Sequence, residues 1–263
     1  MAENPVLLTV DARGVATVTF NRPEVNNAYN GALIDGLLRT LDTLDRQPEL
    51  RAVVLRGNGR HFQAGADLTW IREIRGQDAA ANERASMATA EAVRRLNEAP
   101  CPTVALIRGA CIGGGTGIAA ACDVVVAAED AFFAISETRW GLMAGIIIPQ
   151  LVDAMGIRQL RRYALTGERF DAQEARRIGL AHEVVPADQL EAAGARIVDA
   201  ILMNAPDATQ QTKRRSLLVA QSLLDAKAVE ALVREHAAKR QSPEADEGLA
   251  SFAEKRKPAW YRS

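Results

Sequence analysis

The chain has 263 residues, and its 32 Lys and Arg nearly balance its 33 Asp and Glu, which gives a formal net charge of −1. This length is sufficient for one large domain, and the balanced charge argues against a nucleic-acid or anionic-membrane partner. No apolar run is long enough to cross a bilayer, and Met1–Pro5 does not resemble a signal peptide, so we expect a cytoplasmic protein. The three cysteines lack paired CxxC spacing and are expected to be buried thiols, which leaves no metal site.

Strand and helix signals alternate along the first two-thirds of the chain, and the last third is almost entirely helical. The expected strands cover residues 6–10, 15–20, 52–57, 103–107, 123–128, 131–135 and 183–185. The expected helices cover residues 30–45, 68–75, 82–98, 187–203, 206–222 and 225–240, with shorter ones after the glycines at 113–117, from Asp171 and from Ser242. Such alternation favours an α/β fold with parallel crossovers, and residues 11–14 predict one hairpin turn.

The segment Thr103–Gly117 is a strand, a turn with three consecutive glycines, and the start of a helix. Free N–H groups at a helix start favour an anion, either a phosphate or an oxyanion. Gly115-x-Gly117-x-x-Ala120 loosely matches a dinucleotide fingerprint, for which Glu129 or Glu137 would be the acid. Close packing of helix on sheet, with no ligand, would also use these glycines.

A second turn of small residues, Phe62-Gln-Ala-Gly-Ala-Asp-Leu68, also lies between a strand and a helix. Two such turns can converge, so that one backbone N–H from each binds a single oxygen atom. Donors placed where negative charge develops form an oxyanion hole, and each contributes about 10²–10³ in rate. The pair of turns therefore favours an oxyanion site over a phosphate site.

These motifs together resemble the enoyl-CoA hydratase/isomerase, or crotonase, family. The matching segments are Phe62-x-Ala-Gly-Ala-Asp67-Leu, Gly113-Gly114-Gly115, Ala121-Cys122-Asp123, Asn21-Arg22-Pro23 and Phe252-x-Glu-Lys-Arg-Lys-Pro258. The resemblance implies a ββα spiral core over residues 1–195 and a helical C-terminal oligomerisation region over 196–263. It also implies a homotrimer, or a hexamer made of two trimers.

The same resemblance assigns residues to a thioester site. The N–H groups of Ala66 and Gly114 would hold the thioester oxygen, and coenzyme A, as part of the substrate, would be the only nucleotide present, without a separate cofactor. The residues that would contact coenzyme A are Val25, Ala64, Asp67, Phe252 and Lys255.

The catalytic acid–base group implied by the resemblance is Glu137, which follows an apolar strand. A carboxylate beside Trp140 and Leu142 is expected to have a raised pKa. The family's other glutamate would fall at Gly117, so this chain departs from the two-glutamate pattern. Glu137 could act alone as a hydratase, a residue from another loop could assist it, or the protein could be an isomerase; a catalytically silent acyl-CoA-binding protein is a further alternative.

A subgroup of hydratases that act on 3-methylglutaconyl-CoA or isohexenylglutaconyl-CoA resembles this chain at Gly117 and around Trp70. Their substrates carry a second carboxylate, which Arg139 or Arg72 could pair with. Replacement of the glutamate by glycine would remove a repelling charge and leave room for a branch at C3. The apolar run 146–148 would either line a long acyl pocket or pack in the core.

Overall fold

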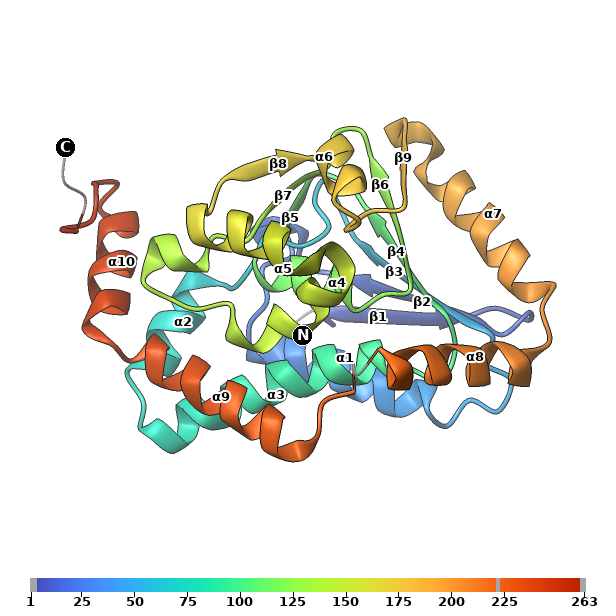
Figure 1. The fold of residues 1–263 in the computed structure, drawn as a ribbon, viewed down its shortest axis with the longest axis horizontal. Coiled ribbons are helices and arrows are strands. Elements are labelled where there is room, and N and C mark those ends of the chain that lie inside the picture. Colours follow the sequence, from blue (N-terminus) through green and yellow to red (C-terminus); the bar gives the residue numbers. More distant parts are fainter. Residues whose placement is uncertain (1–3, 221–222, 261–263) are drawn as a thin grey trace.

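The computed structural model describes residues 4–220 and 223–260, and Figure 1 shows how their helices surround two sheets. The strands are β1 Val6–Val10, β2 Val15–Phe20, β3 Ala52–Gly57, β4 Thr103–Ile107, β5 Ala110–Ile112, β6 Val124–Ala128, β7 Phe132–Ala134, β8 Arg169–Asp171 and β9 Glu183–Val185. The larger sheet has the order β1-β2-β3-β4-β6-β9, in which only β1 and β2 are antiparallel. The smaller sheet has the order β5-β7-β8.

The helices account for most of the remaining described chain. The α-helices are α1 Gly31–Leu44, α2 Leu68–Arg75, α3 Ala79–Asn97, α4 Gly114–Ala120, α5 Ile148–Thr166, α6 Ala172–Arg177, α7 Leu190–Leu202, α8 Pro206–Val219, α9 Ala226–Arg240 and α10 Pro243–Ala253. The short 3₁₀ helices are η1 Pro23–Val25, η2 Glu137–Trp140, η3 Gly145–Ile147 and η4 Ala187–Gln189.

Most of the predicted elements are present, including the β1–β2 hairpin and the mixed α/β order. Helix α3 begins three residues earlier than predicted because the Asp78 carboxylate caps it by accepting a hydrogen bond from the Ala81 N–H. Strands β5 and β8 were not predicted, since three-residue strands carry almost no periodicity. Helix α5 was not predicted either, and Gly156, with φ 73° and ψ 153°, interrupts its helical backbone. Residues 221–222 of the predicted helix 206–222 lie outside the described residues.

The central sheet is buried on both faces, as the apolar run in β6 predicts. Val125 belongs to the main core, which α1, α3 and α5 help to form, whereas Val126 belongs to a second core beneath α7. Alternate side chains of one strand therefore enter different cores. The predicted boundary after residue 195 falls inside α7, which packs against β4 and β6.

The C-terminal helices fold back over the rest of the chain. Helix α9 lies along α3 and buries Val229, Val233 and Ala237 (Figure 1). Helix α10 approaches η2 closely, because a Cβ atom on Gly248 would lie only 2.2 Å from the Trp140 carbonyl carbon. These contacts place α9 and α10 beside the loop that follows β7.

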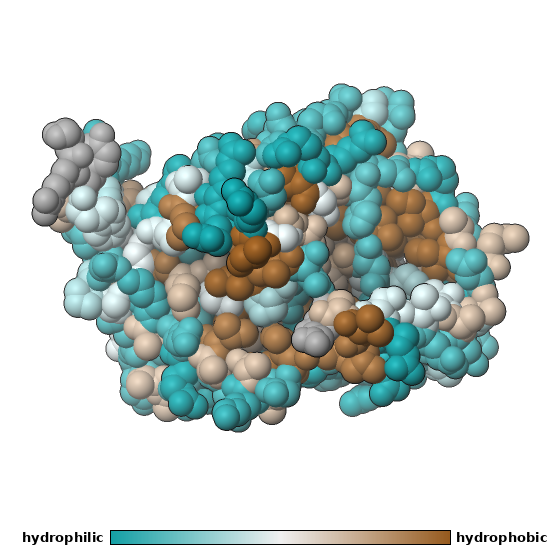
Figure 2. All heavy atoms as spheres, viewed as in Figure 1, coloured by the Kyte–Doolittle hydropathy of each residue, from teal (hydrophilic) through white to brown (hydrophobic). Residues whose placement is uncertain are grey.

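The face of the molecule shown in Figure 2 is largely polar, with scattered apolar patches. Cys101, Cys111 and Cys122 are buried free thiols, as predicted, and burial raises the pKa of each. Among the described residues, none of the helices combines the length and the apolar character that a membrane span requires.

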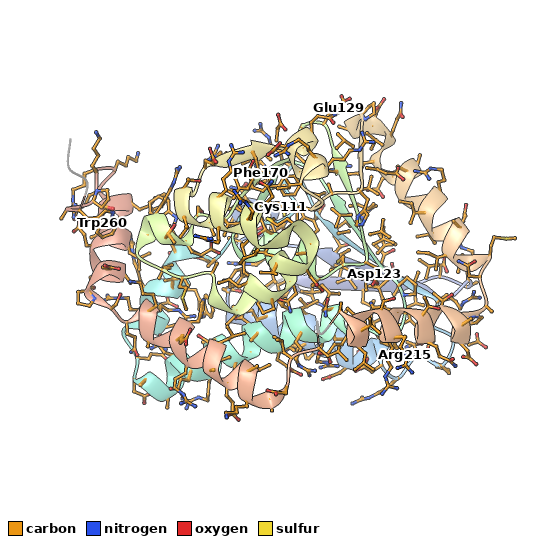
Figure 3. The ribbon with its side chains drawn as sticks, viewed as in Figure 1. Cys111, Asp123, Glu129, Phe170, Arg215 and Trp260 are labelled. Carbon is orange, nitrogen blue, oxygen red and sulfur yellow. The ribbon has the colours of Figure 1, made fainter. Side chains whose placement is uncertain are left out.

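Asp123 connects α8 to the end of the central sheet at which β4 and β6 begin. Figure 3 shows Asp123 beside the start of β6. Its Oδ2 atom accepts hydrogen bonds from the Thr103 N–H at 2.7 Å and from the Thr103 hydroxyl at 2.9 Å. The same oxygen pairs with the Lys213 ammonium at 2.7 Å, and the Lys213 side chain is only 8% exposed. One oxygen thus satisfies three donors from two elements.

Replacement of Asp123 by Ala is therefore expected to lower the free energy of unfolding by about 1–3 kcal/mol, because buried donors lose their acceptor. Urea unfolding measures this change. Asp199→Ala is the control: Asp199 pairs with Arg13 at the surface, where the pair contributes about 0–1 kcal/mol. Equal losses in the two variants would contradict the structural role of Asp123.

Candidate active site

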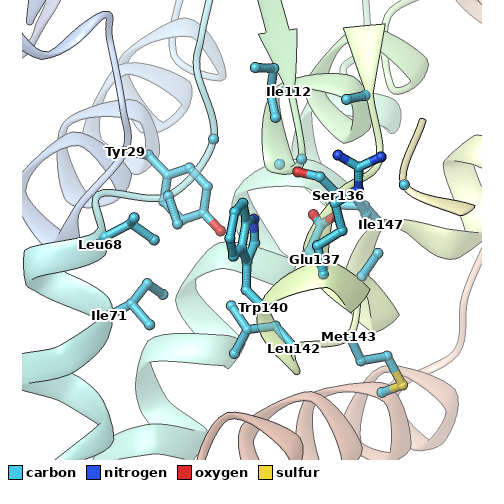
Figure 4. Close-up of a pocket in the computed structure, with 18 of the residues that line it drawn as sticks. Tyr29, Leu68, Ile71, Ile112, Ser136, Glu137, Trp140, Leu142, Met143 and Ile147 are labelled. Carbon is cyan, nitrogen blue, oxygen red and sulfur yellow. The ribbon is translucent and has the colours of Figure 1, made fainter. Parts of the chain in front are cut away.

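A cavity of about 300 Å³ lies between the glycine turn, α2, the η2–η3 segment and the C-terminal helices. Tyr29, Leu68 and Ile71 enter it from one side, and Ser136, Glu137 and Ile147 enter it from the other (Figure 4). The remaining lining residues are Ala64, Gly65, Ala66, Thr89, Ile112, Gly113, Gly114, Ala134, Arg139, Trp140, Leu142, Met143, Ala144, Ile146, Gly167, Arg169, His236, Arg240 and Phe252.

The two small-residue turns meet at this cavity because the segment around Gln63 pairs with β5. The Gln63 N–H donates to the Ala110 carbonyl at 3.0 Å, and the Ile112 N–H donates to the Gln63 carbonyl at 2.9 Å. The fully buried Gln63 side chain also accepts a hydrogen bond from the Gly65 N–H at 2.9 Å. A Cβ atom on Gly115 would lie 2.6 Å from Gln63 Oε1, so this close approach requires glycine.

The N–H groups of Ala66 and Gly114 are available to a ligand. Their neighbours are used within the chain: the Asp67 N–H donates to the Tyr29 carbonyl at 2.8 Å, and the Gly113 N–H donates to the Ala134 carbonyl at 2.8 Å. In the described part of the chain, the N–H groups of Ala66 and Gly114 have no acceptor, and both residues line the cavity. Two free donors on converging backbones provide the geometry of an oxyanion hole.

Glu137 lies directly beside these donors. It begins η2 after β7, and a Cβ atom on Gly113 would lie 2.9 Å from Glu137 Oε1. Its buried Oε2 atom has no hydrogen-bond partner in the described chain. Burial raises the pKa of Glu137 to about 7, although backbone N–H groups of residues 136 and 137 oppose the shift. This carboxyl group can therefore exchange a proton near neutral pH.

The sequence suggested that Gly117 leaves room for a branch of the substrate, but the space beside Gly117 is already filled. Gly117 is buried and does not line the cavity, and a Cβ atom there would lie 2.2 Å from Ile147 Cγ2. The loss of the glutamate therefore leaves no room for a substrate branch, because Ile147 occupies that position and itself faces the cavity. Ile146 also lines the cavity, so both residues combine the two roles considered for the apolar run.

Tyr29, His236 and Arg240 also line the cavity. Burial raises the pKa of Tyr29 to about 12, with a smaller raising effect from Glu137 and an opposing effect from Arg240. Burial and the Arg240 charge lower the pKa of His236 to about 3, so this imidazole is neutral. Its Nδ1 atom lies 2.9 Å from the Ser86 hydroxyl oxygen.

The predicted coenzyme A contacts are only partly gathered at the cavity. Ala64 and Phe252 line it, and Phe252 packs edge-on against Trp140 at a centroid distance of 4.4 Å. Val25 and Lys255 lie outside the lining; the loop of Val25 reaches Ala64 through a hydrogen bond from the Ala64 N–H to the Asn26 carbonyl. The Asp67 side chain also lies outside the lining.

The Asp67 carboxylate has two partners within the chain. It caps α2 by accepting from the Thr69 N–H at 3.0 Å, and it pairs with Arg22 at 3.1 Å. The ion pair joins two of the motifs matched in the sequence, because Asp67 belongs to the segment 62–68 and Arg22 belongs to the segment 21–23.

The predicted substrate contacts also differ in placement. Arg139 lines the cavity with an exposed side chain that lies against Gly167. Arg72 does not line it and instead donates to the Leu249 carbonyl of α10 at 3.5 Å. Trp70 lies behind the wall, edge-on to Tyr29 at a centroid distance of 5.8 Å.

The structure adds Tyr29, Gln63 and Arg240 to the predicted site residues. The sequence pattern could have indicated that Arg240 is buried, because it continues the stripe of Val229, Val233 and Ala237 at helical spacing. Gln63 had none, since its role depends on pairing with a distant strand. The dinucleotide alternative is not supported by the cavity, which neither Gly115 nor Gly117 lines, and Figure 3 places the exposed Glu129 at the edge of the molecule.

Two free backbone donors beside one buried carboxyl group define a site for reactions that pass through an oxyanion next to a proton-transfer step. The sequence profile of the family described as enoyl-CoA hydratase/isomerase matches residues 11–263. The chain belongs to this family and has the crotonase fold. It is an enzyme of hydro-lyase type, with an acyl-CoA thioester as the class of substrate.

Relatives match over nearly the whole chain. A putative enoyl-CoA hydratase of Thermus thermophilus is 34% identical over 96% of this chain and 99% of its own length. The mevalonyl-coenzyme A hydratase of Aspergillus fumigatus is 34% identical over 94% of this chain and 91% of its own. The crystal structure of an enoyl-CoA hydratase from Mycobacterium avium subsp. paratuberculosis has a TM-score of 0.86 at 30% identity, covering 98% of this chain and 99% of that one.

Gly117→Ala is expected to destabilise the fold by about 1–3 kcal/mol, because the added methyl group overlaps Ile147. Thermal or urea unfolding measures the effect. Gly76→Ala is the matched control, since a Cβ atom at Gly76 would be 3.6 Å from its nearest neighbours. A Gly117→Ala protein as stable as the control would show that the space beside Ile147 is open.

Proposed function

We propose that the protein hydrates the C2=C3 bond of a branched glutaconyl-type coenzyme A thioester, either isohexenylglutaconyl-CoA or 3-methylglutaconyl-CoA, in acyclic terpene or leucine catabolism. The observation that carries this proposal is the single buried carboxyl group of Glu137 beside two free N–H groups. Among the described lining residues, no other acidic side chain is present.

In the proposed reaction the thioester oxygen accepts hydrogen bonds from the Ala66 and Gly114 N–H groups. The ionised Glu137 takes a proton from water while the water oxygen bonds to C3, and the electrons of the double bond move to the thioester oxygen as an enolate. The enolate then reforms the carbonyl as Glu137 returns its proton to C2. One water is added and Glu137 ends as it began, so a second acid is not needed.

The apolar lining of the cavity supports a long acyl chain. Ile146, Ile147, Leu142 and Met143 give it an apolar wall, which favours the longer isohexenyl chain. Burial of each additional methylene contributes about 0.8 kcal/mol, so such a wall distinguishes long chains from short ones. Arg139 at the same cavity is one candidate partner for the second carboxylate.

The adenine end of coenzyme A would lie along the backbone of residues 64–67 and the loop of Val25. Lys255 and Phe252 would contact coenzyme A from the end of α10. Phe252 supports this placement because it lines the cavity of its own chain, whereas Lys255 is exposed two residues after α10 ends.

The alternative is an enoyl-CoA isomerase, because one carboxylate suffices to move a proton from one carbon to another. A Δ(3,5)-Δ(2,4)-dienoyl-CoA isomerase of Dictyostelium discoideum is 31% identical over 94% of this chain. Mass analysis separates the two: a hydratase product gains one water, and an isomerase product keeps the substrate mass. Binding without turnover of any enoyl-CoA would favour a silent binding protein.

Glu137→Gln is expected to lower kcat for hydration by about 10²–10⁴, the usual contribution of a general acid–base group. Loss of the enoyl absorbance of 3-methylglutaconyl-CoA and crotonyl-CoA follows the reaction. Glu83→Gln, an exposed acid outside the cavity, is the control. Hydration at the wild-type rate in the Glu137 variant would overturn its assigned role.

The pH profile gives a second test of Glu137. Because the base must be ionised and burial raises its pKa to about 7, kcat/KM is expected to fall as the pH is lowered through about 7. An unperturbed glutamate would place this limb near pH 4. A kcat/KM that does not change between pH 5 and pH 8 would exclude Glu137 as the base.

We further propose that the chain forms a homotrimer or a hexamer. Exposed apolar side chains at the ends of α7 and α8 support an interface there: Met203 is 86% exposed, Val219 74% and Leu218 51%. Light scattering is expected to give three or six times the chain mass of 28.4 kDa. A monomer at micromolar concentration would contradict this assembly.

A further inference from the structure

Arg240 is a buried cation at the wall of the cavity. Arg240 is the last residue of α9 and is only 3% exposed. The Nη2 atom lies 3.0 Å from the Ser86 hydroxyl oxygen and 3.2 Å from His236 Nδ1. The buried Nη1 atom has no hydrogen-bond partner in the described chain. Two neutral groups therefore contact one nitrogen, and the other terminal nitrogen is unsatisfied.

The described residues also provide no counter-ion for this guanidinium, because no carboxylate lies within 4.0 Å of it. A buried charge without a partner is costly, and the cost is removed when an anion binds. Burial accordingly lowers the pKa of Arg240, and Tyr29 opposes this shift. An arginine nevertheless stays charged at neutral pH.

The other two arginines of the cavity have different surroundings. Arg139 is exposed, so water already solvates its charge. The Arg169 guanidinium lies over the Phe132 ring, 5.0 Å from its centroid. Only Arg240, among the described lining residues, combines burial with an unsatisfied nitrogen.

Arg240 and Glu137 both line the cavity, and Tyr29 is close enough to both that each charge affects the pKa of its phenol group. Its ring is also within contact of the glycine turn, because a Cβ atom on Gly114 would lie 2.6 Å from Tyr29 Cε1. An acyl chain held at Gly114 would thus pass Tyr29 on its way towards Arg240.

We propose that Arg240 binds the distal carboxylate of the acyl group, which restricts the preferred substrates to coenzyme A monothioesters of dicarboxylic acids. The proposal deepens the hydratase function and depends on it only for the acyl position in the cavity. The Ser86 hydroxyl and the neutral His236 hold the Nη2 atom of the guanidinium, and Nη1 is left for the ligand. Trp70, whose ring centre is 6.0 Å from the guanidinium carbon, supports it from behind the wall.

The experiment compares binding of two unreactive thioesters that differ only by a terminal carboxylate, glutaryl-CoA and butyryl-CoA. Calorimetry is performed on the wild type, Arg240→Met and Arg240→Lys. We expect Arg240→Met to weaken glutaryl-CoA binding roughly 10- to 100-fold, the range of a charge-assisted hydrogen bond, and to leave butyryl-CoA within about twofold. Arg240→Lys is expected to recover part of the loss, since it restores the charge without the planar fork.

Arg234→Met is the matched control, because Arg234 is an exposed arginine on the same helix. Thermal unfolding identifies a variant that has lost its fold, and unchanged butyryl-CoA binding shows that the thioester site is intact. Equal weakening of both thioesters by Arg240→Met would overturn the proposal. If Arg139→Met selectively weakened glutaryl-CoA binding and Arg240→Met did not, the carboxylate would instead be assigned to the exposed Arg139.

Turnover provides a second readout with the pair 3-methylglutaconyl-CoA and 3-methylcrotonyl-CoA, which share the branch and differ by the carboxylate. Arg240→Met is expected to lower kcat/KM only for the first, mainly through KM. If the wild type hydrates neither thioester, the hydratase proposal fails. The binding comparison still decides the role of Arg240, because it requires no reaction.

Discussion

The site depends above all on the parallel pairing between the segment around Gln63 and β5. This pairing brings a loop that follows β3 against the turn that precedes α4, and the buried Gln63 amide fixes both at once. The neighbouring N–H groups of Asp67 and Gly113 donate to the Tyr29 and Ala134 carbonyls, and among the described residues one N–H on each loop is left without an acceptor. The proposed oxyanion site therefore consists of backbone groups brought together by sheet pairing, and no side chain is required to build it.

Much of the architecture could be predicted from local patterns, because it rests on periodicity and capping. The strands of the central sheet, the hairpin and the helix that follows the glycine turn are set by residues that are close in sequence. The sequence could not show that Ile147 fills the place beside Gly117, or that Arg72 turns away towards α10. Both depend on contacts between segments separated by 30 to more than 170 residues, for which one sequence carries no signal.

Two of the charged groups that line the cavity, Glu137 and Arg240, share an unusual condition. Each has a buried polar atom without a partner in the described residues, although buried groups in folded proteins are nearly always hydrogen-bonded. The chain has enough charged residues to pair them, yet each is surrounded by apolar or neutral neighbours. Such unsatisfied groups reduce stability and are typical of sites prepared for a ligand, where the substrate supplies the missing contacts.

Helix α9 and the η3 segment contact each other and line one part of the cavity, whereas the two small-residue turns and η2 line another. These two parts belong to different stretches of the chain. Under the proposed function, substitutions on α9 would therefore alter which acyl groups fit without disturbing the groups that bind the thioester. A division of this kind lets one scaffold diversify among substrates while its chemistry is inherited unchanged.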